Sequence, residues 1–474
     1  MNKEDICFLP AYEMAEKIKS QELTSQEITE VIIERIEKIN PIINAYCTPT
    51  LDLAREMAKK ADEAVKSGEK LGVLNGIPLS IKDLTETKGI RTTYGSLLYE
   101  DYIPSEDDIE VKRLKKAGCV ILGKTNCPEL GWWCVTYNKI FGETKNPWNL
   151  AKTPGGSSGG AAAANASGLS PLALGSDGGG SIRIPGCFCG VYGLKPTFGR
   201  IPHHTMRFLG SYGTLVHKGP IVRYVKDAAL MLDALVGEDF SDRCSLPKPN
   251  YSFFEEIKKA PNKLKIGYLL NLGRTKAIEP EVKNGFLNAV QIFEKLDWLV
   301  EKTKIVLKNL EYLDNILSIP STAYILKPFM EKDEEMFDPE LVKDLKTVNT
   351  YSLQDVKIAE VQRELIYETV CRQFKKYDLL LTLTLPCTAF DLGKTAPDAI
   401  NGKKVTPKEW YCYNTYPFNL TGHPAASIPC GWSSEGLPIG MQIVGKKYDD
   451  LLVLQVSKAF EELAPWQDKR PKLD

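Results

Sequence analysis

Residues 169–186 read LSPLALGSDGGGSIRIPG, an apolar run that passes through Asp177 into three successive glycines and a serine. The short apolar segment 171–174 is typical of a buried strand. No side chain shields the peptide groups of 178–180, and successive exposed N–H groups form a nest that attracts negative charge. The stretch therefore predicts a strand that ends at an anion-binding loop, with Ser181 as a nucleophile beside it. Taken alone, the motif fits a plain glycine turn equally well.

Further apolar runs of this kind recur along the chain, at 76–81, 119–123, 264–270, 378–384, 425–430 and 438–445. Segments with helical periodicity separate them. Residues 24–39 begin with Thr24 and Glu27 in the spacing of a capping box and place isoleucine and valine along one face. Similar helices are expected at about 50–67, 107–117 and 352–375. The alternation predicts an α/β fold, and one sheet fed from both ends of the chain is more economical than two domains.

The bulk composition excludes several classes of function. The chain of 474 residues carries 60 Lys and Arg against 61 Asp and Glu, so charge gives no reason to expect nucleic acid or a membrane as partner. The first residues, MNKEDICFLP, lack the apolar core of a signal peptide, which predicts a cytoplasmic protein. The 12 cysteines form no C-x-x-C pair and only 4 histidines are present, so we expect neither a metal nor another cofactor.

A lysine stands at the end of one predicted strand, in GIPLSIKDL at 76–84. Strand alternation puts Lys82 on the face opposite Leu79 and Ile81. Burial there would lower the pKa of the lysine by several units, which would make it a usable base near neutral pH. The alternative for this nonapeptide is a strand-end lysine that pairs with Asp83 or Glu86.

A second glycine-rich stretch, KTPGGSSGGAAAA at 152–164, places Ser157 and Ser158 before an alanine-rich helix. A helix N-terminus attracts anions, but the Walker spacing and its lysine are absent, which argues against a phosphate site. The motif also matches G-x-S-x-G, the nucleophile elbow of α/β-hydrolases, and His423 could complete a Ser-His-Asp esterase. An elbow needs an apolar strand before the serine, whereas 145–154 reads KNPWNLAKTP.

Considered together, the three motifs are more specific than any one alone. A serine that attacks an amide needs a base, and with so few histidines Lys82 is the candidate, reached through the hydroxyl of Ser157. The order Lys82, Ser157, Ser181 resembles the amidase signature family. The remaining stretches that carry the resemblance are GKTNCPE at 123–129, NPW at 146–148, GVYGLKPT at 190–197, PFNLTGHPAASIPCG at 417–431 and GLPIGMQIVG at 436–445.

The resemblance covers about residues 20–465 and implies a large mixed β-sheet covered by helices on both faces. It implies one amidase signature domain over 1–474, with N-terminal helices at about 1–68 packed on it. The implied catalytic triad is Lys82, Ser157 and Ser181, with a cis peptide before Ser157. The implied oxyanion hole consists of the N–H groups of Gly178, Gly179, Gly180 and Ser181. Supporting roles fall to Ser158, Asp177 and Arg183.

The implied activity is hydrolysis of a small-molecule carboxamide to a carboxylate plus ammonia or an amine, without a cofactor. The alternatives are a glutaminase subunit of a tRNA-dependent amidotransferase, the esterase above and a non-catalytic binding module. Residues 318–350 lack the central segment expected of the glutaminase subunits, which favours a stand-alone amidase. We keep a homodimer as a hypothesis. The aromatic residues that could line an acyl pocket are Trp132, Trp133, Tyr137 and Phe141.

Overall fold

We describe the protein from a computed structural model, which covers residues 1–204, 213–259, 261, 263–273, 275 and 277–473. Within these residues, eleven strands form one sheet in the order β1-β3-β2-β6-β8-β7-β14-β15-β11-β9-β10. Its strands are β1 (Tyr46–Pro49), β2 (Pro78–Lys82), β3 (Val120–Thr125), β6 (Leu172–Asp177), β7 (Tyr192–Lys195), β8 (His217–Val222), β9 (Lys265–Leu269), β10 (Leu299–Lys302), β11 (Leu379–Leu383), β14 (Ala425–Trp432) and β15 (Pro438–Gly445). Two short hairpins lie apart from it, β4 (Tyr137–Asn138) with β5 (Gly142–Glu143), and β12 (Ala399–Ile400) with β13 (Lys403–Lys404).

The sheet is mixed, as the resemblance implied. Strand β2 runs parallel to β3 and to β6, and β9 runs parallel to β10 and to β11. The central strands β6, β8, β7, β14, β15 and β11 are joined by antiparallel pairs. The chain thus builds one half-sheet from its first 180 residues and the other from its last 210, about an antiparallel middle. One sheet fed from both ends of the chain is confirmed.

The helices of the structure are α1 (Lys3–Phe8), α2 (Ala11–Lys19), α3 (Ser25–Ile43), α4 (Leu51–Lys66), α5 (Ile109–Lys116), α6 (Gly159–Ala166), α7 (Arg183–Cys189), α8 (Val225–Leu235), α9 (Phe253–Glu256), α10 (Pro280–Ile292), α11 (Leu310–Asp333), α12 (Pro339–Lys346), α13 (Leu353–Phe374), α14 (Glu409–Cys412), α15 (Pro417–Leu420) and α16 (Asp450–Leu463). The capping box at the start of α3 is present, with the Thr24 side chain on the Glu27 N–H and the Glu27 carboxylate on the Thr24 N–H. A second capping box, at Ser352 and Asp355, begins α13.

Helices cover both faces of the sheet. Every residue of β2, β3, β6, β8 and β11 is buried, which a strand achieves only when both of its faces are covered. Helices α6 and α7 pack together on the central strands, and α8 and α16 form a second packed pair on the same strands. This arrangement confirms the α/β fold with helices on a large mixed sheet.

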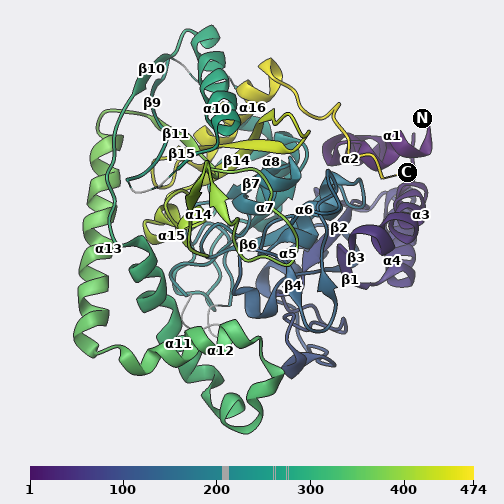
Figure 1. Cartoon of the computed structure of the whole chain (residues 1–474). Coiled ribbons are helices and arrows are strands. Elements are labelled where there is room, and N and C mark those ends of the chain that lie inside the picture. The colour runs from purple at the N-terminus through teal and green to yellow at the C-terminus, as the bar shows by residue number, and fades with distance from the viewer. Residues whose placement is uncertain (205–212, 260, 262, 274, 276, 474) are drawn as a thin grey trace.

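The N-terminal helices share the main hydrophobic core with the sheet. Figure 1 shows α1 to α4 side by side at one end of the molecule, near the C-terminus. Ile28, Ile32 and Ile36 of α3 belong to the same buried cluster as Leu79 of β2 and Leu473 near the C-terminus. Folding of α1 to α4 is therefore coupled to the sheet through shared apolar burial.

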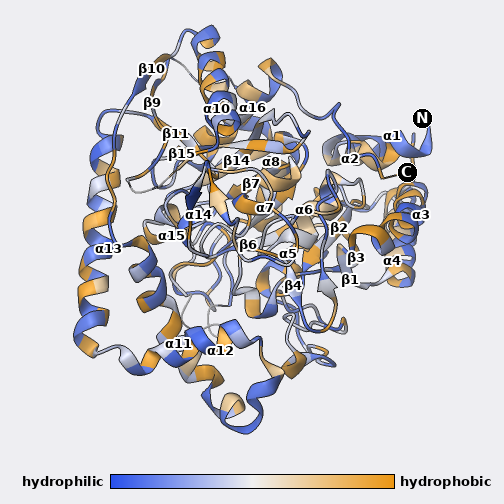
Figure 2. Ribbon diagram, viewed as in Figure 1, coloured by the Kyte–Doolittle hydropathy of each residue, from blue (hydrophilic) through white to orange (hydrophobic). Residues whose placement is uncertain are grey.

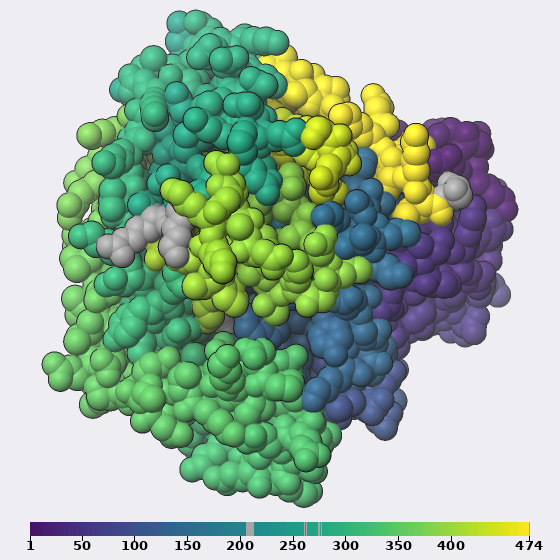
Figure 3. Space-filling view, viewed as in Figure 1, coloured from purple at the N-terminus to yellow at the C-terminus, as the bar shows by residue number. Residues whose placement is uncertain are grey.

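A separate small core lies under α11 and α12. It joins Leu326 of α11 and Leu341 of α12 to Tyr94 and Leu130, two residues from the loops that follow β2 and β3. In Figure 3 these helices form the green lower margin of the molecule. The α11–α12 segment is thus anchored on loops that emerge from the sheet edge, next to the site described below.

Two further properties of the chain are plain from the structure. All 12 cysteines lie among the described residues, and each is a free thiol. No helix in the described part of the chain is long and apolar enough to cross a membrane.

Candidate active site

Two of the three predicted catalytic side chains, Lys82 and Ser157, meet at one edge of the sheet, and Ser181 lines the same cavity as Ser157. Lys82 is the last residue of β2, and Asp177 is the last residue of the parallel neighbour β6. Parallel strands end at the same edge, so the loop after β6 arrives beside Lys82. Helix α6 begins at Gly159, directly after Ser157 and Ser158. Lys82 Nζ lies 2.7 Å from Ser157 Oγ, within hydrogen-bond reach.

Lys82 has no contact with solvent. Its exposed fraction is 0%, and burial lowers the pKa of its ammonium from 10.5 to about 7. The expected alternative, an ion pair with Asp83 or Glu86, is wrong, since no ion pair of the described residues includes Lys82. Asp83 instead accepts from the Thr93 hydroxyl at 2.5 Å, and Glu86 accepts from the hydroxyl of Tyr94 at 2.8 Å. Lys82 is therefore placed as a buried amine without a counter-ion.

Ser176 also contacts Lys82, and sequence reasoning did not single it out. Its Oγ lies 3.0 Å from Lys82 Nζ, and its N–H approaches Ser158 Oγ at 3.4 Å. The signal was present, because Ser176 stands one residue before the predicted end of the strand at Asp177. A hydroxyl near the end of β6 can reach Lys82 at the end of the parallel neighbour β2.

The glycines around Ser157 allow close backbone approach. The Gly156–Ser157 peptide is cis, as the resemblance implied. A Cβ at Gly156 would lie 2.7 Å from the Val135 carbonyl oxygen, and one at Gly160 would lie 2.5 Å from both Ala45 O and Asn126 N. Backbone from three separate segments therefore surrounds this turn, and any side chain at either position would push it away from Lys82.

Ser181 follows the glycine loop and leads into α7. Its exposed fraction is 7%, and its carbonyl accepts from the Ser158 N–H at 3.1 Å. Ser158 thus ties the Ser157 turn to the Ser181 loop. The Gly180 N–H donates to Asp177 Oδ1 at 2.8 Å, so it holds the loop and is not directed to an oxyanion. The candidate oxyanion donors that remain are therefore the N–H groups of Gly178, Gly179 and Ser181.

Asp177 and Arg183 form a buried ion pair that fixes the loop. Arg183 Nη2 lies 2.9 Å from Asp177 Oδ1, and both side chains are fully buried. Burial alone would raise the pKa of Asp177, but Arg183 and the Asn419 amide outweigh it and hold the pKa well below its usual range. Asp177 is therefore a permanent anion that supports the loop and has no part in proton transfer.

Residues from the C-terminal half complete this support. Arg183 Nη2 donates to Asn419 Oδ1 at 2.6 Å, and Arg183 Nη1 donates to Gln442 Oε1 and to the Thr415 carbonyl, each at 2.7 Å. Asn419 and Gln442 lie in the stretches 417–431 and 436–445, which carried the resemblance. Their roles were missed, because only the tertiary fold brings them to Arg183.

A cavity of about 1150 Å³, including the solvent at its mouth, opens over these groups. Ser157, Ser176 and Ser181 lie on its wall with Gly178 and Gly179. Trp132 and Trp133 line it as predicted, together with Tyr411 of α14. Tyr137 and Phe141 line other surface hollows, because the β4–β5 hairpin carries them away from the serines.

The comparison with protein families gives one decisive result. The model of the family described as Amidase matches residues 27–454, which is most of the chain. This chain belongs to the amidase family. The enzyme is accordingly a hydrolase that acts on amide carbon–nitrogen bonds.

Known amidases resemble this one over their full length. An acylamidase from Rhodococcus erythropolis is 37% identical over 99% of this chain and 98% of its own. One subunit of the glutamyl-tRNA(Gln) amidotransferase from Moorella thermoacetica is also 37% identical, over 99% of both chains. The crystal structure of a bacterial aryl acylamidase superposes with a TM-score of 0.91 at 31% identity, covering 97% of each chain. The chain is equally identical to an acylamidase and to an amidotransferase subunit, so sequence identity does not discriminate between these two kinds of relative.

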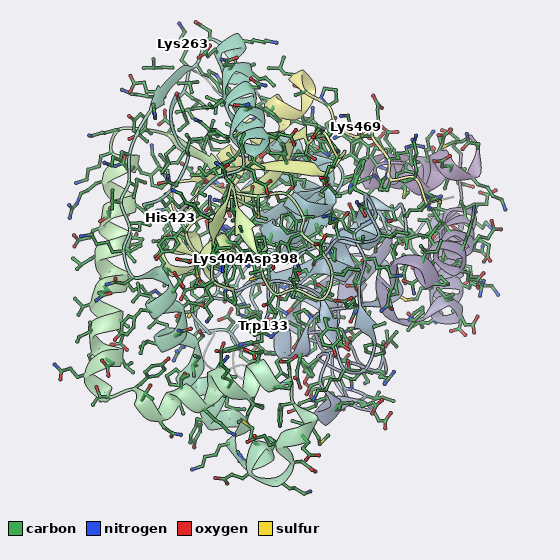
Figure 4. All side chains as sticks on the ribbon, in the orientation of Figure 1. Trp133, Lys263, Asp398, Lys404, His423 and Lys469 are labelled. Carbon is green, nitrogen blue, oxygen red and sulfur yellow. The ribbon has the colours of Figure 1, made fainter. Side chains whose placement is uncertain are left out.

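His423 of this amidase does not line the cavity that contains Ser157 and Ser181. Burial lowers the pKa of its imidazole to about 3, and its ring stacks on Phe374 of α13. Figure 4 shows His423 well apart from Trp133 of the cavity wall. Within the described residues, no helix or strand leads into Ser157 as an elbow would require, so the esterase alternative is not supported. No group of three or more His, Cys, Asp or Glu in that part of the chain could hold a metal ion.

Proposed function

We propose that this amidase is a stand-alone enzyme that hydrolyses a carboxamide through an acyl-enzyme, with Ser181 as nucleophile, Ser157 as proton relay and Lys82 as base. The observation that carries the proposal is the 2.7 Å approach of Lys82 Nζ to Ser157 Oγ at a fully buried position. Because burial lowers the pKa of Lys82 to about 7, a large share of this lysine is neutral near pH 7, and a neutral amine accepts a proton.

In the acylation step, Ser181 Oγ attacks the carbonyl carbon of the amide. Its proton passes to Ser157 Oγ while the proton of Ser157 passes to Lys82 Nζ. The tetrahedral intermediate then collapses and the C–N bond breaks. Lys82 returns its proton through Ser157 to the departing nitrogen, so ammonia or an amine leaves and an ester to Ser181 remains.

Deacylation repeats these transfers with water. Water attacks the ester carbon and gives its proton through Ser157 to Lys82, and the C–O bond to Ser181 then breaks. The proton returns to Ser181 Oγ, which releases the carboxylic acid and restores the triad. The N–H groups of Gly178, Gly179 and Ser181 are the proposed donors to the oxyanion in both steps.

The cavity wall favours amides with an apolar or aromatic acyl group. Trp132, Trp133 and Tyr411 present large apolar faces beside the serines. The likeness to an acylamidase and to an aryl acylamidase supports this substrate class. The alternative function is that of a glutaminase subunit. Its support is the amidotransferase relative, which is as identical to this chain as the acylamidase is.

The test is amine or ammonia release by the purified chain alone from benzamide, hexanamide, acetanilide and glutamine. We expect turnover of the first three amides and its loss in Ser181→Ala. Hydrolysis of glutamine without hydrolysis of the other three amides would favour the amidotransferase alternative. Activity that appears only when a partner protein is added would favour it as well. Size-exclusion chromatography of the same preparation tests the homodimer.

A further inference from the structure

A second buried lysine, Lys218, lies on β8, the strand next to β6 of the site. Strands β6 and β8 are antiparallel, and Ser176 of β6 is the register partner of Lys218 of β8. Residues opposite each other in an antiparallel pair project from the same face, with Cβ atoms about 5 Å apart. Since Ser176 Oγ contacts Lys82 Nζ, Lys218 projects toward the same edge as Lys82. Lys218 also lines the cavity over Ser181.

Lys218 is held by an acid behind it. Its Nζ lies 2.7 Å from Glu110 Oε1 and donates to Thr85 Oγ1 at 2.9 Å. Glu110 stands in the first turn of α5 and is fully buried, and it does not line the cavity, whereas Lys218 does. Of the two partners, Lys218 is therefore the one that reaches the cavity wall.

The carboxylates beside Lys218 favour its charged form. Burial lowers the pKa of this lysine, but the carboxylates of Glu110 and Asp108 outweigh burial and leave the pKa above its ordinary value. Elsewhere on the cavity wall, burial and the same ammonium lower the pKa of His203 to about 4, so that imidazole is neutral. Glu86, also on the wall, accepts from two tyrosine hydroxyls.

The other titratable groups around Lys82 are compensated by a partner or shifted toward their neutral forms. Arg183 neutralises Asp177, and burial raises the pKa of the thiols of Cys127 and Cys134 far above neutrality. Burial raises the pKa of Asp83, the residue after Lys82 in the chain, and lowers that of Lys124 on the neighbouring strand β3. Lys218 is thus the cation whose charge acts on Lys82 in the same direction as burial does.

We infer that the Lys218–Glu110 pair is a positioning device that presents a fixed positive charge to Lys82 and so keeps Lys82 in its neutral, proton-accepting form. This inference rests on the proposed function of Lys82 as base. A buried ion pair gains little stability over apolar side chains of the same size, because two charges must be desolvated. Its use here is electrostatic, since a like charge nearby disfavours protonation of the base.

The test replaces both partners, Lys218→Met with Glu110→Gln, so that no unpaired charge stays buried. The readout is the pH dependence of Ser181 phosphonylation by a fluorophosphonate, which requires no knowledge of the natural amide, together with that of benzamide hydrolysis. We expect the acidic limb of both profiles to move up by about half to one pH unit, since removal of the cation eases protonation of Lys82. At a pH on the acidic limb, the double variant should therefore react about three- to tenfold more slowly than the wild type. At high pH the two rates should be equal.

Two matched variants separate charge from packing. Lys218→Arg keeps the cation and should keep the limb in place. Removal of the buried pair Arg200–Asp450, which lines no part of the cavity, by Arg200→Met with Asp450→Asn should also leave the limb unmoved. An unmoved limb in the Lys218 and Glu110 double variant, in folded protein that is still labelled, overturns the inference and leaves the proposed function intact. Absence of labelling in the wild type, or labelling retained in Ser181→Ala, overturns the proposed function, and the inference falls with it.

Discussion

At the scale of the residue, the proposed role of Lys82 as base predicts the pH range in which the enzyme works. Its ammonium form cannot accept a proton, and burial places its pKa at about 7. Activity should therefore be fully present above this pKa and should fall about tenfold per pH unit below it. The measurement is kcat/KM for benzamide between pH 5 and pH 9. A profile that stays flat down to pH 5 would exclude Lys82 as the base.

Ser176 offers a sharper test, because the site geometry alone assigns it. Its hydroxyl is the second oxygen within reach of Lys82 Nζ, and its loss would leave the amine held by Ser157 and a backbone carbonyl. We expect Ser176→Ala to lower kcat by about tenfold with little change in KM, since the large aromatic side chains of the cavity wall are untouched. Ser157→Ala, which breaks the relay, should cost about a thousandfold or more. Equal rates for Ser176→Ala and wild type would contradict this role.

At the scale of the element, the start of α6 depends on glycine for space. A Cβ at Gly160 would meet two backbone atoms at 2.5 Å, and backbone cannot rotate away as a side chain can. Gly160→Ala should therefore destabilise the fold by about 1–3 kcal/mol, although alanine favours helix more than glycine does. Urea denaturation measures the change in the free energy of unfolding. A stabilised variant would show that propensity outweighs the close approach.

Helix α13 shows what an apolar periodicity does not tell. The pattern at 352–375 predicted the helix correctly, and Figure 2 shows hydrophobic segments alternating with hydrophilic ones along it. Leu365 is 54% exposed, whereas its neighbour Ile366 is 6% exposed. Helical spacing alone thus did not tell which apolar residues pack: Ala359, Ile366 and Val370 are buried, whereas Ile358, Val361 and Leu365 are exposed.

The two neighbours on α13 give a matched pair of variants. Ile366→Ala should cost about 2–5 kcal/mol of the free energy of unfolding, because it empties a buried position. Leu365→Ala removes a side chain of the same size from a solvent-exposed position and should stay within about 0.5 kcal/mol. The melting temperatures of the two variants report the difference. Equal shifts would place a partner or a packed surface over Leu365.

At the scale of the whole molecule, we propose that the chain is one domain over 1–474 and that the helices at about 1–68 are part of it. Ile32 and Ile36 of α3 lie in the same buried cluster as the sheet, so removal of 1–68 would delete β1 and expose apolar surface on β3. We expect the truncated chain to lose cooperative thermal unfolding, as followed by calorimetry. Ile32→Ala in the full chain should lower stability by about 2–5 kcal/mol, and a soluble, active truncation would divide the chain into two units.

Much of the fold could be predicted because its signals are local. The capping box at Thr24, the apolar runs of β2 and β6 and the hairpin of β14 and β15 each depend on a few adjacent residues. The loop 178–180 and the serines at 157 and 181 were found for the same reason, since glycine runs and hydroxyls are legible in the sequence. Family membership followed from the order of these local motifs.

By itself, then, the amino-acid sequence determined the main strands, several of the helices, and the lysine and serines proposed to carry the chemistry. The tertiary structure alone decided what surrounds them. Burial and the absence of a counter-ion at Lys82, the contact from Ser176, and the support of Arg183 by Asn419 all come from segments distant in the chain. The physical reason is that a pKa depends on the dielectric and the charges in the space around a group, and these are set by packing rather than by neighbours in sequence.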